Sequence, residues 1–419
     1  MNDLNFRAPK GTRDILWPDS ARHQLLTEVF AEVVSEAGYT QVITPMFEHV
    51  EVFQRLGGAT DVVRKEMYDF QDKGGRHLAL RPEQTASVVR AFNEHRPAIP
   101  WKAWYTGPNF RYERSQKGRF RQFSQVGIEV LGVEDPYLDV EVMALAWRFY
   151  ERLGLRQVKL ELNSLGSKED RNKFIDALQQ HFTQSLSELS EESQKTLEVN
   201  PLRVLDSNRE QDAHLISAAP SMLDFLSKDS EEHFTQVQEG LNSLNIPFSV
   251  NPKLVRGLDY YIRTAFEFIS ESFDAAQNAI GGGGRYDGLV EDLGGPSTPG
   301  VGFAIGTDRT LLACDAEKTF QMPEAAIEVF VVDVTGGMEA LKLTTELRNA
   351  GFKTDRAWDN RSMKAQMKLA DRSGALFAII VGEEEVASDT VILRDLREST
   401  GQSKITRETI QEDLRKRLR

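Results

Sequence analysis

A short basic segment, residues 111–121, is the part of the sequence best suited to bind an anion. It holds five basic residues and one acidic residue, a local charge of +4 in a chain whose net charge is −13. Phe110, Tyr112, Phe120 and Phe123 are interleaved with the basic residues. Guanidinium groups bind phosphate oxygens in pairs, and aromatic rings stack on nucleotide bases. The segment predicts a phosphate or nucleotide site, although a solvated loop explains it equally well.

A run of four glycines, Gly281–Gly284, precedes the charged segment Arg285–Gly288. Because no Cβ intervenes, a ligand could approach this backbone closely, but a flexible turn is the simpler interpretation. No Gly-Lys-Ser/Thr follows, which excludes a Walker phosphate loop. The spacing of Gly300, Gly302 and Gly306 is one residue too long for the dinucleotide fingerprint, and prolines rather than a strand precede it. The glycine run therefore stays open between a ligand contact and a turn.

Three more polar groups could belong to a site. Arg256–Tyr261 places an arginine, an acid and two tyrosines within six residues, which fits a small polar ligand or a strand with a surface ion pair. Glu83 and Thr85 stand where a helix begins, so capping alone would explain the carboxylate. Gln125 and Glu129 lie four residues apart on a predicted strand and share one face. That face is either the floor of a site or a solvent face.

The composition is that of a folded protein in a reducing compartment. Of 419 residues, 40% are hydrophobic and 27% charged, which excludes a disordered or fibrous chain and predicts two or three domains. The single cysteine, Cys314, forms no internal disulfide and no Cys-based zinc site. Residues 1–7 lack the apolar core of a signal peptide, and no stretch reaches 18 apolar residues. We therefore expect a cytoplasmic protein that does not enter a membrane.

Hydrophobic patterning predicts that residues 1–325 form one α+β domain on an antiparallel sheet. A helix is expected to begin at Asp19 or Ser20 and to end before Gly38. The expected strands are Tyr39–Thr44, Trp101–Arg111, Arg119–Leu131, Lys159–Asn163, Thr264–Ser270 and Gly302–Ile305. Residues 112–118 are predicted to form a hairpin loop between the second and third strands.

An acidic helical insertion, about residues 168–250, is predicted inside this domain. Residues 181–240 hold twelve acidic and four basic residues, a net charge of −8, and show helical spacing. Much of the negative charge of the chain is therefore concentrated here. A chain with that distribution can bind a polyanion through basic residues gathered elsewhere.

Residues 326–419 alternate between strand and helix patterns after a linker near Met322–Ala326. This alternation predicts a three-layer α/β domain with a largely parallel sheet. The expected strands are Ile327–Val334, Lys353–Ala357, Leu376–Val381 and Thr390–Leu393, and the expected helices are Gly337–Ala350, Ser362–Asp371 and Thr406–Leu418.

The order of these segments resembles the class II aminoacyl-tRNA synthetases, and specifically the histidyl-tRNA synthetase family. The three general motifs are matched by Gly38–Phe47, by Phe110–Glu113 with Arg119 and Phe123, and by Gly300, Gly302, Gly306 and Arg309. More specific matches are Arg256–Tyr261 and Gly283–Asp287, which are similar to the paired histidine motifs, and Gly11–Asp14 and Arg81–Thr85. The third motif of the family usually has Glu before its arginine. Asp308 stands there in this chain, so the orientation of Arg309 is left open.

The resemblance implies a role for each matched side chain. Arg111, Arg256 and Arg309 would be the catalytic cations. ATP would be bound by Arg111, Glu113, Phe123 and Arg309. Histidine would be bound by Glu83, Thr85, Gln125, Glu129, Arg256, Tyr260, Tyr261 and Tyr286. Lys117 and Arg119 would lie near the acceptor end of tRNA.

The resemblance also implies a reaction and its partners. L-histidine would be activated by ATP, with Mg²⁺ held mainly by the ATP phosphates rather than by protein side chains, and then transferred to histidine tRNA. The family implies a homodimer with the first motif at the interface, an anticodon-binding C-terminal domain, and an insertion that approaches the acceptor stem. The few basic residues of the insertion, such as Arg203 and Arg209, must face the RNA, or the insertion must stand away from it.

Three alternatives remain. The regulatory paralogue that partners ATP phosphoribosyltransferase shares the fold, but it generally lacks the C-terminal domain and both intact histidine motifs. A class II synthetase for another amino acid would not need Arg256–Tyr261. A nucleotide-binding protein without tRNA would leave the C-terminal domain unexplained.

Overall fold

The computed structural model describes residues 6–55, 62–114, 118–255, 257–273, 278–321, 326–359, 361–397 and 401–418. The chain divides into two compact units, residues 1–14 with 23–321 and residues 322–419 with 15–22. Within the described ranges, none of the helices combines the length and apolar character that a membrane crossing requires.

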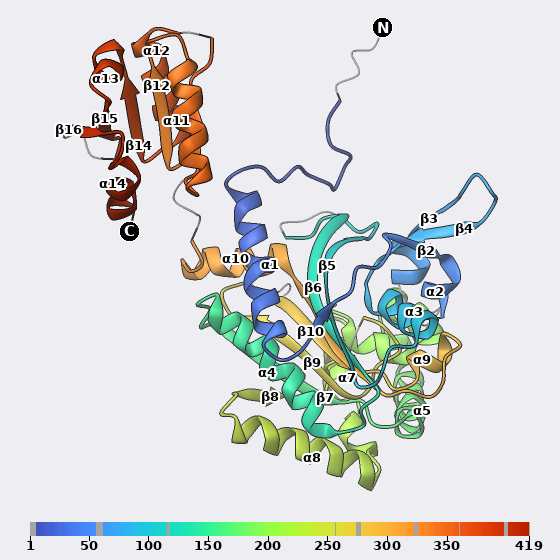
Figure 1. Cartoon of the computed structure of the whole chain (residues 1–419). Helices are drawn as coiled ribbons and strands as arrows, with labels where there is room; N and C mark the ends of the chain where they lie inside the picture. The colour runs from blue at the N-terminus through green and yellow to red at the C-terminus, as the bar shows by residue number, and fades with distance from the viewer. Residues whose placement is uncertain are drawn as a thin grey trace, which may run out of the picture. The chain divides into compact units, whose positions relative to one another are not determined.

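An eight-stranded sheet forms the centre of the first unit (Figure 1). Its strands, in spatial order, are β1 (Thr40–Gln41), β5 (Trp101–Phe110), β6 (Gln122–Leu131), β11 (Gly300–Gly306), β10 (Ala279–Arg285), β9 (Ile262–Ser270), β7 (Val158–Ser164) and β8 (Phe248–Val250). Only the two outermost pairs, β1 with β5 and β7 with β8, are parallel. The predicted antiparallel α+β fold is confirmed, and the sheet is continuous from the motif hairpin β5–β6 to the glycine run.

Three helices cover one side of this sheet: α1 (Asp19–Ser35), α4 (Pro136–Arg152) and α8 (Lys228–Ser243) (Figure 1). Apolar side chains from all three, including Phe30, Phe149 and Leu241, pack in one core with the sheet. Helix α4 begins at Pro136, where the sequence favours a helix start. The Asp135 side chain accepts a hydrogen bond from the Tyr137 amide, and proline occupies the first helical position.

The glycine run does not form the expected flexible turn. Gly281–Gly284 lie inside β10, hydrogen-bonded to β9 and β11. A Cβ added to Gly283 would lie 2.0 Å from the Gly302 carbonyl oxygen, and one on Gly281 would lie 2.5 Å from the Tyr150 hydroxyl. Gly283 is therefore required by close packing against the neighbouring strand and Gly281 by close packing against α4, and turn propensity does not reveal either contact.

A small second sheet and several short helices flank the large one. The sheet has the order β2 (Phe47–His49), β4 (His77–Leu80), β3 (Tyr68–Gln71). The helices are α2 (Val50–Gln54), the π-helical turn η1 (Val62–Glu66), α3 (Thr85–His95), α9 (Leu289–Asp292) and α10 (Thr307–Glu317). Helix α3 begins beside Glu83 and α10 carries Arg309, so both helices lead directly into the site.

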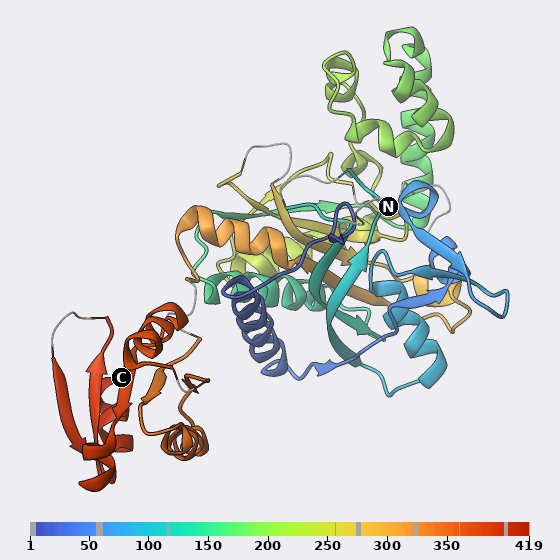
Figure 2. The ribbon, with the colours of Figure 1, turned by 90° about the horizontal axis from the view of Figure 1, so that it is seen from above.

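The helical insertion forms its own small core, built from Phe174, Leu178, Leu197, Val204 and other apolar side chains. Its elements are α5 (Lys168–Gln184), η2 (Leu186–Glu188), α6 (Glu191–Val199), η3 (Pro201–Asp206), α7 (Ala213–Ser217) and η4 (Met222–Phe225), followed by α8. The helices before α8 project from the sheet as a separate cluster (Figure 2).

The second unit is a five-stranded sheet with helices on both faces. Its order is β13 (Thr354–Arg356), β12 (Val329–Asp333), β14 (Phe377–Val381), β15 (Thr390–Asp395), β16 (Gln402–Thr406). Helices α11 (Met338–Asn349) and α14 (Ile410–Arg417) pack on one face and α12 (Met363–Ser373) on the other, while α13 (Glu383–Ala387) connects β14 to β15. The predicted three layers are confirmed.

The prediction of a largely parallel sheet in this unit is wrong. Strands β13, β12 and β14 are parallel, but β14–β15 and β15–β16 are antiparallel. Only α13 separates β14 from β15, and a parallel return needs a crossover of a dozen or more residues. The sequence analysis also missed β16, a largely exposed edge strand without an apolar pattern, and it began the last helix at Thr406 instead of Ile410.

Candidate active site

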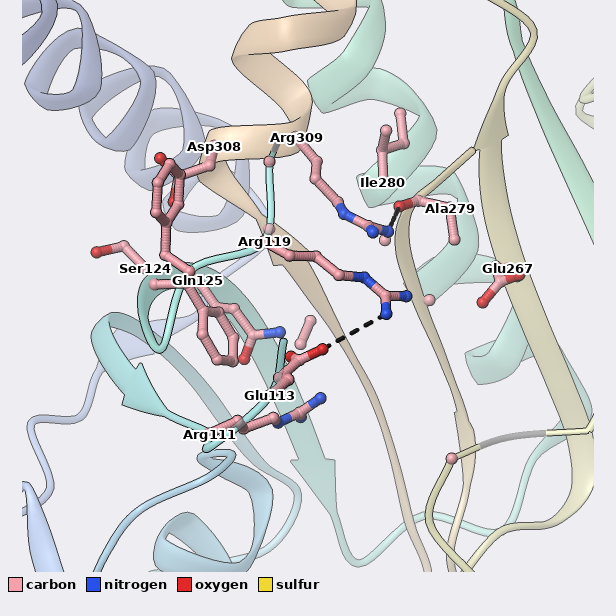
Figure 3. A pocket seen from close by; sticks show the side chains of 18 of the residues that line it. Arg111, Glu113, Arg119, Ser124, Gln125, Glu267, Ala279, Ile280, Asp308 and Arg309 are labelled. Carbon is pink, nitrogen blue, oxygen red and sulfur yellow. Dashed lines mark hydrogen bonds and ion pairs between the residues drawn. The ribbon is translucent and has the colours of Figure 1, made fainter. Parts of the chain in front are cut away.

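A cavity of about 410 Å³ lies between the β5–β6 hairpin, β10, β11 and the start of α10 (Figure 3). Six of the residues to which the resemblance assigned a role line it: Arg111, Glu113, Arg119, Phe123, Gln125 and Arg309. Figure 3 shows the guanidinium groups of Arg111, Arg119 and Arg309 directed into the same space. Lys117 and Arg256 lie outside the described residues.

Arg111 is anchored by a backbone carbonyl that does not line the cavity, and its guanidinium group points into the cavity. Its Nε donates to the Pro82 carbonyl oxygen over 2.9 Å, and its guanidinium carbon lies 5.3 Å from the centre of the Phe123 ring. One nitrogen is therefore used for anchoring, and a ring lies next to the cation. This arrangement offers an anion-binding fork beside an aromatic face.

Arg309 carries a buried donor without a hydrogen-bond partner among the described residues. Its Nη1 donates to the Ala279 carbonyl oxygen over 2.6 Å, while Nη2 is buried and makes no hydrogen bond. Burial, with Arg119 nearby, lowers the pKa of Arg309. Buried guanidinium donors are almost always paired, so an anionic ligand is the expected partner here.

Asp308 does not orient Arg309, which answers the question the sequence left open. Its carboxylate pairs with Arg13 and lies 3.7 Å from His23 Nε2. The Arg13 guanidinium also lies 4.2 Å from the centre of the Phe120 ring. The Ala279 carbonyl therefore fixes Arg309, and Asp308 instead connects the start of α10 to the Gly11–Asp14 element.

Glu113 and Arg119 face each other across the cavity at 3.4 Å (Figure 3). Both are partly exposed, with side-chain exposures of 20% and 40%. Arg119, which the resemblance assigned to the tRNA acceptor end, thus lies within the cavity that Arg111 and Arg309 also line. A ligand that enters between them would have to displace this ion pair, which is long and partly exposed.

A second group of predicted residues is gathered around Glu129, which is buried in β6. Thr85 Oγ1 donates to Glu129 Oε1 over 2.7 Å, Tyr105 donates to the same oxygen over 3.3 Å, and Tyr286 donates to Oε2. Glu129 is 1% exposed, and burial raises its pKa to about 8. The face that Glu129 shares with Gln125 is therefore the floor of a site and not a solvent face.

Glu83 caps helix α3, as the capping interpretation of its position predicted. Its carboxylate accepts the Thr85 amide over 2.7 Å and the Ala86 amide over 2.9 Å. Burial raises the pKa of Glu83. Each carboxylate oxygen keeps capacity for another donor, so the capping role and a ligand contact are compatible.

Tyr260 and Tyr261 complete the second group, and they do not form the alternative strand. Tyr260 stands in a turn and Tyr261 directly follows it; each is 8% exposed, and their hydroxyls lie 3.4 Å apart. The Tyr260 ring packs edge-on against Tyr286 at 5.8 Å between centres. Both rings are thus connected to Glu129 through Tyr286, whose hydroxyl donates to that carboxylate.

Strand β6 joins the two groups. Gln125 lines the cavity and accepts Asn109 Nδ2 over 2.7 Å, and Glu129 stands four residues further along the same strand face. The candidate site therefore has a charged, open half and an adjoining buried half that contains two carboxylates and four tyrosines.

Comparisons with known proteins fit this arrangement. A family model described as "Histidyl-tRNA synthetase" matches residues 11–310, and one described as "Anticodon binding domain" matches residues 328–417. The chain belongs to the histidyl-tRNA synthetase family. The family predicted from the motifs is thereby confirmed.

Members of the histidyl-tRNA synthetase family resemble the chain over nearly its whole length. A curated histidine–tRNA ligase of Geobacillus kaustophilus is 47% identical over 91% of this chain and 92% of its own length. One from Bacillus velezensis is 45% identical over 97% and 98%. A crystal structure of the apo Staphylococcus aureus histidyl-tRNA synthetase has a TM-score of 0.80 at 36% identity and covers 98% of this chain and 99% of that one.

Two further residues of the candidate site were not predicted from the sequence. Tyr105, which contacts Glu129, lies opposite Gly127 in the hairpin, where a Cβ would come within 2.4 Å of the tyrosine hydroxyl. Glu267 lines the cavity opposite Gly282 on the neighbouring strand. In both cases a glycine lies opposite a larger polar residue on the neighbouring strand. This pattern can be recognised only when the strand register is known.

The described residues hold no group of three or more His, Cys, Asp or Glu side chains arranged to bind a metal ion. The carboxylates that line the synthetase cavity are Glu66, Glu113, Glu267 and Asp308. Of these, Glu113 is paired with Arg119 and Asp308 with Arg13.

Proposed function

We propose that this chain is a histidine–tRNA ligase that activates L-histidine with ATP and transfers it to histidine tRNA. The observation that carries the proposal is the cavity in which three arginines converge next to the buried Glu129 and its tyrosines. The open half has the charge to bind a polyphosphate, and the buried half has the polarity to bind one small side chain.

ATP is proposed to occupy the open half. Arg111 would contact the α-phosphate and Arg309 the outer phosphates, since Arg309 has a buried donor to satisfy. Phe123 would stack on the adenine, and Glu113 would accept its amino group after releasing Arg119. Mg²⁺ would accompany ATP and neutralise charge on the outer phosphates, with the cavity carboxylates within reach of its water shell.

Histidine is proposed to occupy the buried half. An imidazole has one nitrogen that donates a hydrogen bond and one that accepts a hydrogen bond. Glu129 would accept from the first, and the Tyr261 hydroxyl would donate to the second. Glu83, Thr85 and Gln125 would bind the α-amino group, and Tyr260 and Tyr286 would line the pocket. A ring without these nitrogens would displace protein donors from Glu129 without replacing their hydrogen bonds, which gives the pocket its selectivity.

The first step needs positive charge more than a covalent nucleophile. A histidine carboxylate oxygen forms a bond to the α-phosphorus while the bond to the bridging oxygen breaks and pyrophosphate leaves. Arg111 would stabilise charge on the α-phosphate and Arg309 charge on the leaving group. Arg256 is proposed as a further cation at the α-phosphate.

The second step passes the histidyl group to the terminal ribose of tRNA, and AMP leaves. Lys117 and Arg119 stay proposed contacts for the acceptor end. Residues 326–419 are proposed as the anticodon-binding domain and residues 1–325 as the catalytic domain, with the insertion at about 168–250.

A hollow of about 280 Å³ in the second unit supports an RNA contact. It lies where β12 and β13 end, beside Gly336 and Gly337. Trp358 is 55% exposed and Met338 61% exposed, and the Arg356 guanidinium carbon lies 3.9 Å from the centre of the Trp358 ring. An exposed indole ring with a guanidinium group beside it can stack on an unstacked base of single-stranded RNA.

A homodimer and a cytoplasmic location belong to the same proposal. Around the first motif, Ile43 is 84% exposed, Met46 52% and Phe47 51%, next to Phe70 of the small sheet. β1 is also an edge strand of the large sheet. Apolar surface of this kind beside an open edge is typical of a subunit interface. Light scattering should give twice the chain mass of 47.3 kDa.

One assay tests the function and separates the alternatives. ATP–pyrophosphate exchange is measured with each of the twenty amino acids, and tRNA charging is measured afterwards. Exchange with histidine alone, followed by charging of histidine tRNA, is the expected result. Exchange with another amino acid would indicate a different synthetase, and no exchange would favour the regulatory paralogue or a nucleotide-binding protein.

A further inference from the structure

The loop between β8 and β9 contacts the candidate site on one side and the helical insertion on the other. Val255 and Gly257 line the 410 Å³ cavity. Further along the same loop, Tyr260 and Tyr261 lie in the apolar core that also contains Tyr286. Asp259 lies in the chain between the cavity-lining residues and the two tyrosines.

Three side chains of the insertion converge on Asp259. Arg171 of α5 donates from Nη1 to the Asp259 main-chain oxygen over 2.6 Å, and its Nη2 lies 3.6 Å from Oδ1. Arg203 Nη2 of η3 also lies 3.6 Å from Oδ1, and Asn200 donates to that oxygen over 3.5 Å. The carboxylate and both arginines are each only about one-fifth exposed. Partial burial strengthens such interactions compared with pairs on the surface.

The geometry points to Asp259 as a positioning residue for histidine activation, held by Arg171 and Arg203 of the insertion. This inference rests on the proposed function. It gives the insertion a part in amino-acid activation that needs no tRNA. It also accounts for a basic residue in an acidic segment, because Arg203 is directed toward Asp259. Arg209 pairs with Glu192 at 3.5 Å and serves the insertion alone.

The test is histidine-dependent pyrophosphate exchange without tRNA, with KM measured separately for histidine and ATP. Asp259→Asn keeps the shape and removes the charge, and Arg203→Met removes one partner. Each should lower kcat/KM for histidine about tenfold and change the KM for ATP less than twofold, because Asp259 adjoins the tyrosines whereas Arg111 and Arg309 lie on other elements. Arg203→Lys should recover part of the loss.

Arg209→Met is the matched control, since it removes an arginine of the same insertion that has no contact with Asp259 in the contacts described. It should leave exchange unchanged. The double variant Asp259→Asn with Arg203→Met should lose no more than Asp259→Asn alone, because the interaction that Arg203→Met removes is already lost in it. Additive losses, equal losses for histidine and ATP, or unchanged exchange in Asp259→Asn would overturn the positioning role. Absence of histidine exchange in the unsubstituted protein would instead overturn the proposed function.

Discussion

Thr85 Oγ1 donates to Glu129 Oε1 over 2.7 Å and so joins the first turn of α3 to the middle of β6. The same carboxylate also accepts Tyr105 and Tyr286, so its hydrogen bonds are satisfied in the absence of a ligand. A histidine that enters the buried half must therefore exchange some of these bonds for its own. Histidine recognition therefore depends on whether its ring can replace the protein groups that donate to the Glu129 carboxylate.

Replacement of Glu129 by Gln should weaken histidine binding far more than ATP binding. Gln keeps the size but cannot accept from all of the present donors, and an unsatisfied buried polar group costs about 1–3 kcal/mol. We expect the KM for histidine to rise about 10- to 100-fold, with the KM for ATP changed less than threefold. Steady-state pyrophosphate exchange measures both constants, and an equal rise in both would contradict the assignment.

The unliganded protein should lose stability as the pH rises from about 5 to 8. Burial raises the pKa of Glu129 to about 8, above its ordinary value, so the folded state holds a proton that the unfolded state has released. Stability from this group is therefore complete below the ordinary pKa and is lost through the folded pKa. The slope is at most about 1.4 kcal/mol per pH unit.

Urea unfolding at several pH values measures this dependence. Glu129→Gln has no carboxylate at that position, so the pH dependence between 5 and 8 should be reduced in it. The same slope in both proteins would show that Glu129 does not hold a proton in the folded state.

Arg309 and Asp308 are neighbours in sequence but should differ sharply on substitution. Arg309→Ala removes a cation from the cavity and should lower kcat for pyrophosphate exchange about 100-fold, the usual cost of one donor to developing charge. Asp308→Asn weakens the pairing with Arg13 and leaves the Ala279 carbonyl to orient Arg309, so a loss of two- to threefold is expected. If Asp308→Asn were as damaging as Arg309→Ala, the carbonyl would not be sufficient to fix the arginine.

Gly302→Ala should destabilise the protein by about 3 kcal/mol or more. The added Cβ would lie 1.9 Å from Glu129 Oε2 and 2.3 Å from the Ile128 carbonyl oxygen, and backbone cannot move aside cheaply inside a sheet. Gly288→Ala is the control, because nothing lies within 4 Å of its Cβ position. Urea unfolding of both variants gives the comparison, and similar free energies of unfolding would contradict the close packing around Glu129.

Trp358→Ala should impair tRNA charging and leave histidine activation unchanged. Loss of one stacking partner costs about 1–3 kcal/mol, so the KM for tRNA in charging should rise about tenfold or more. Pyrophosphate exchange should not change, because Trp358 belongs to the second unit. A normal KM for tRNA would mean that the hollow beside Trp358 does not hold a base.

The sequence by itself determined the order of the elements and the types of the chemical groups. Apolar alternation was sufficient to predict β5, β6, β7 and β9 within a few residues, because period-two burial is a local property. The motifs around Arg111 and Arg309 were sufficient to predict the family. The sequence could not place the glycine run in a central strand, because what requires Gly283 is the carbonyl of Gly302 on the neighbouring strand.

Only the tertiary structure decided which charges face one another. Asp308 pairs with Arg13, 295 residues away in sequence, and the Arg309 beside it turns to Ala279. Arg203 turns inward to Asp259 instead of outward. Tyr105 meets Glu129 across the hairpin. Side-chain partners depend on strand register and on how an insertion folds back, and neither is encoded in local spacing. The charge of each residue was readable from the sequence, but the partner of each charge was a property of the fold.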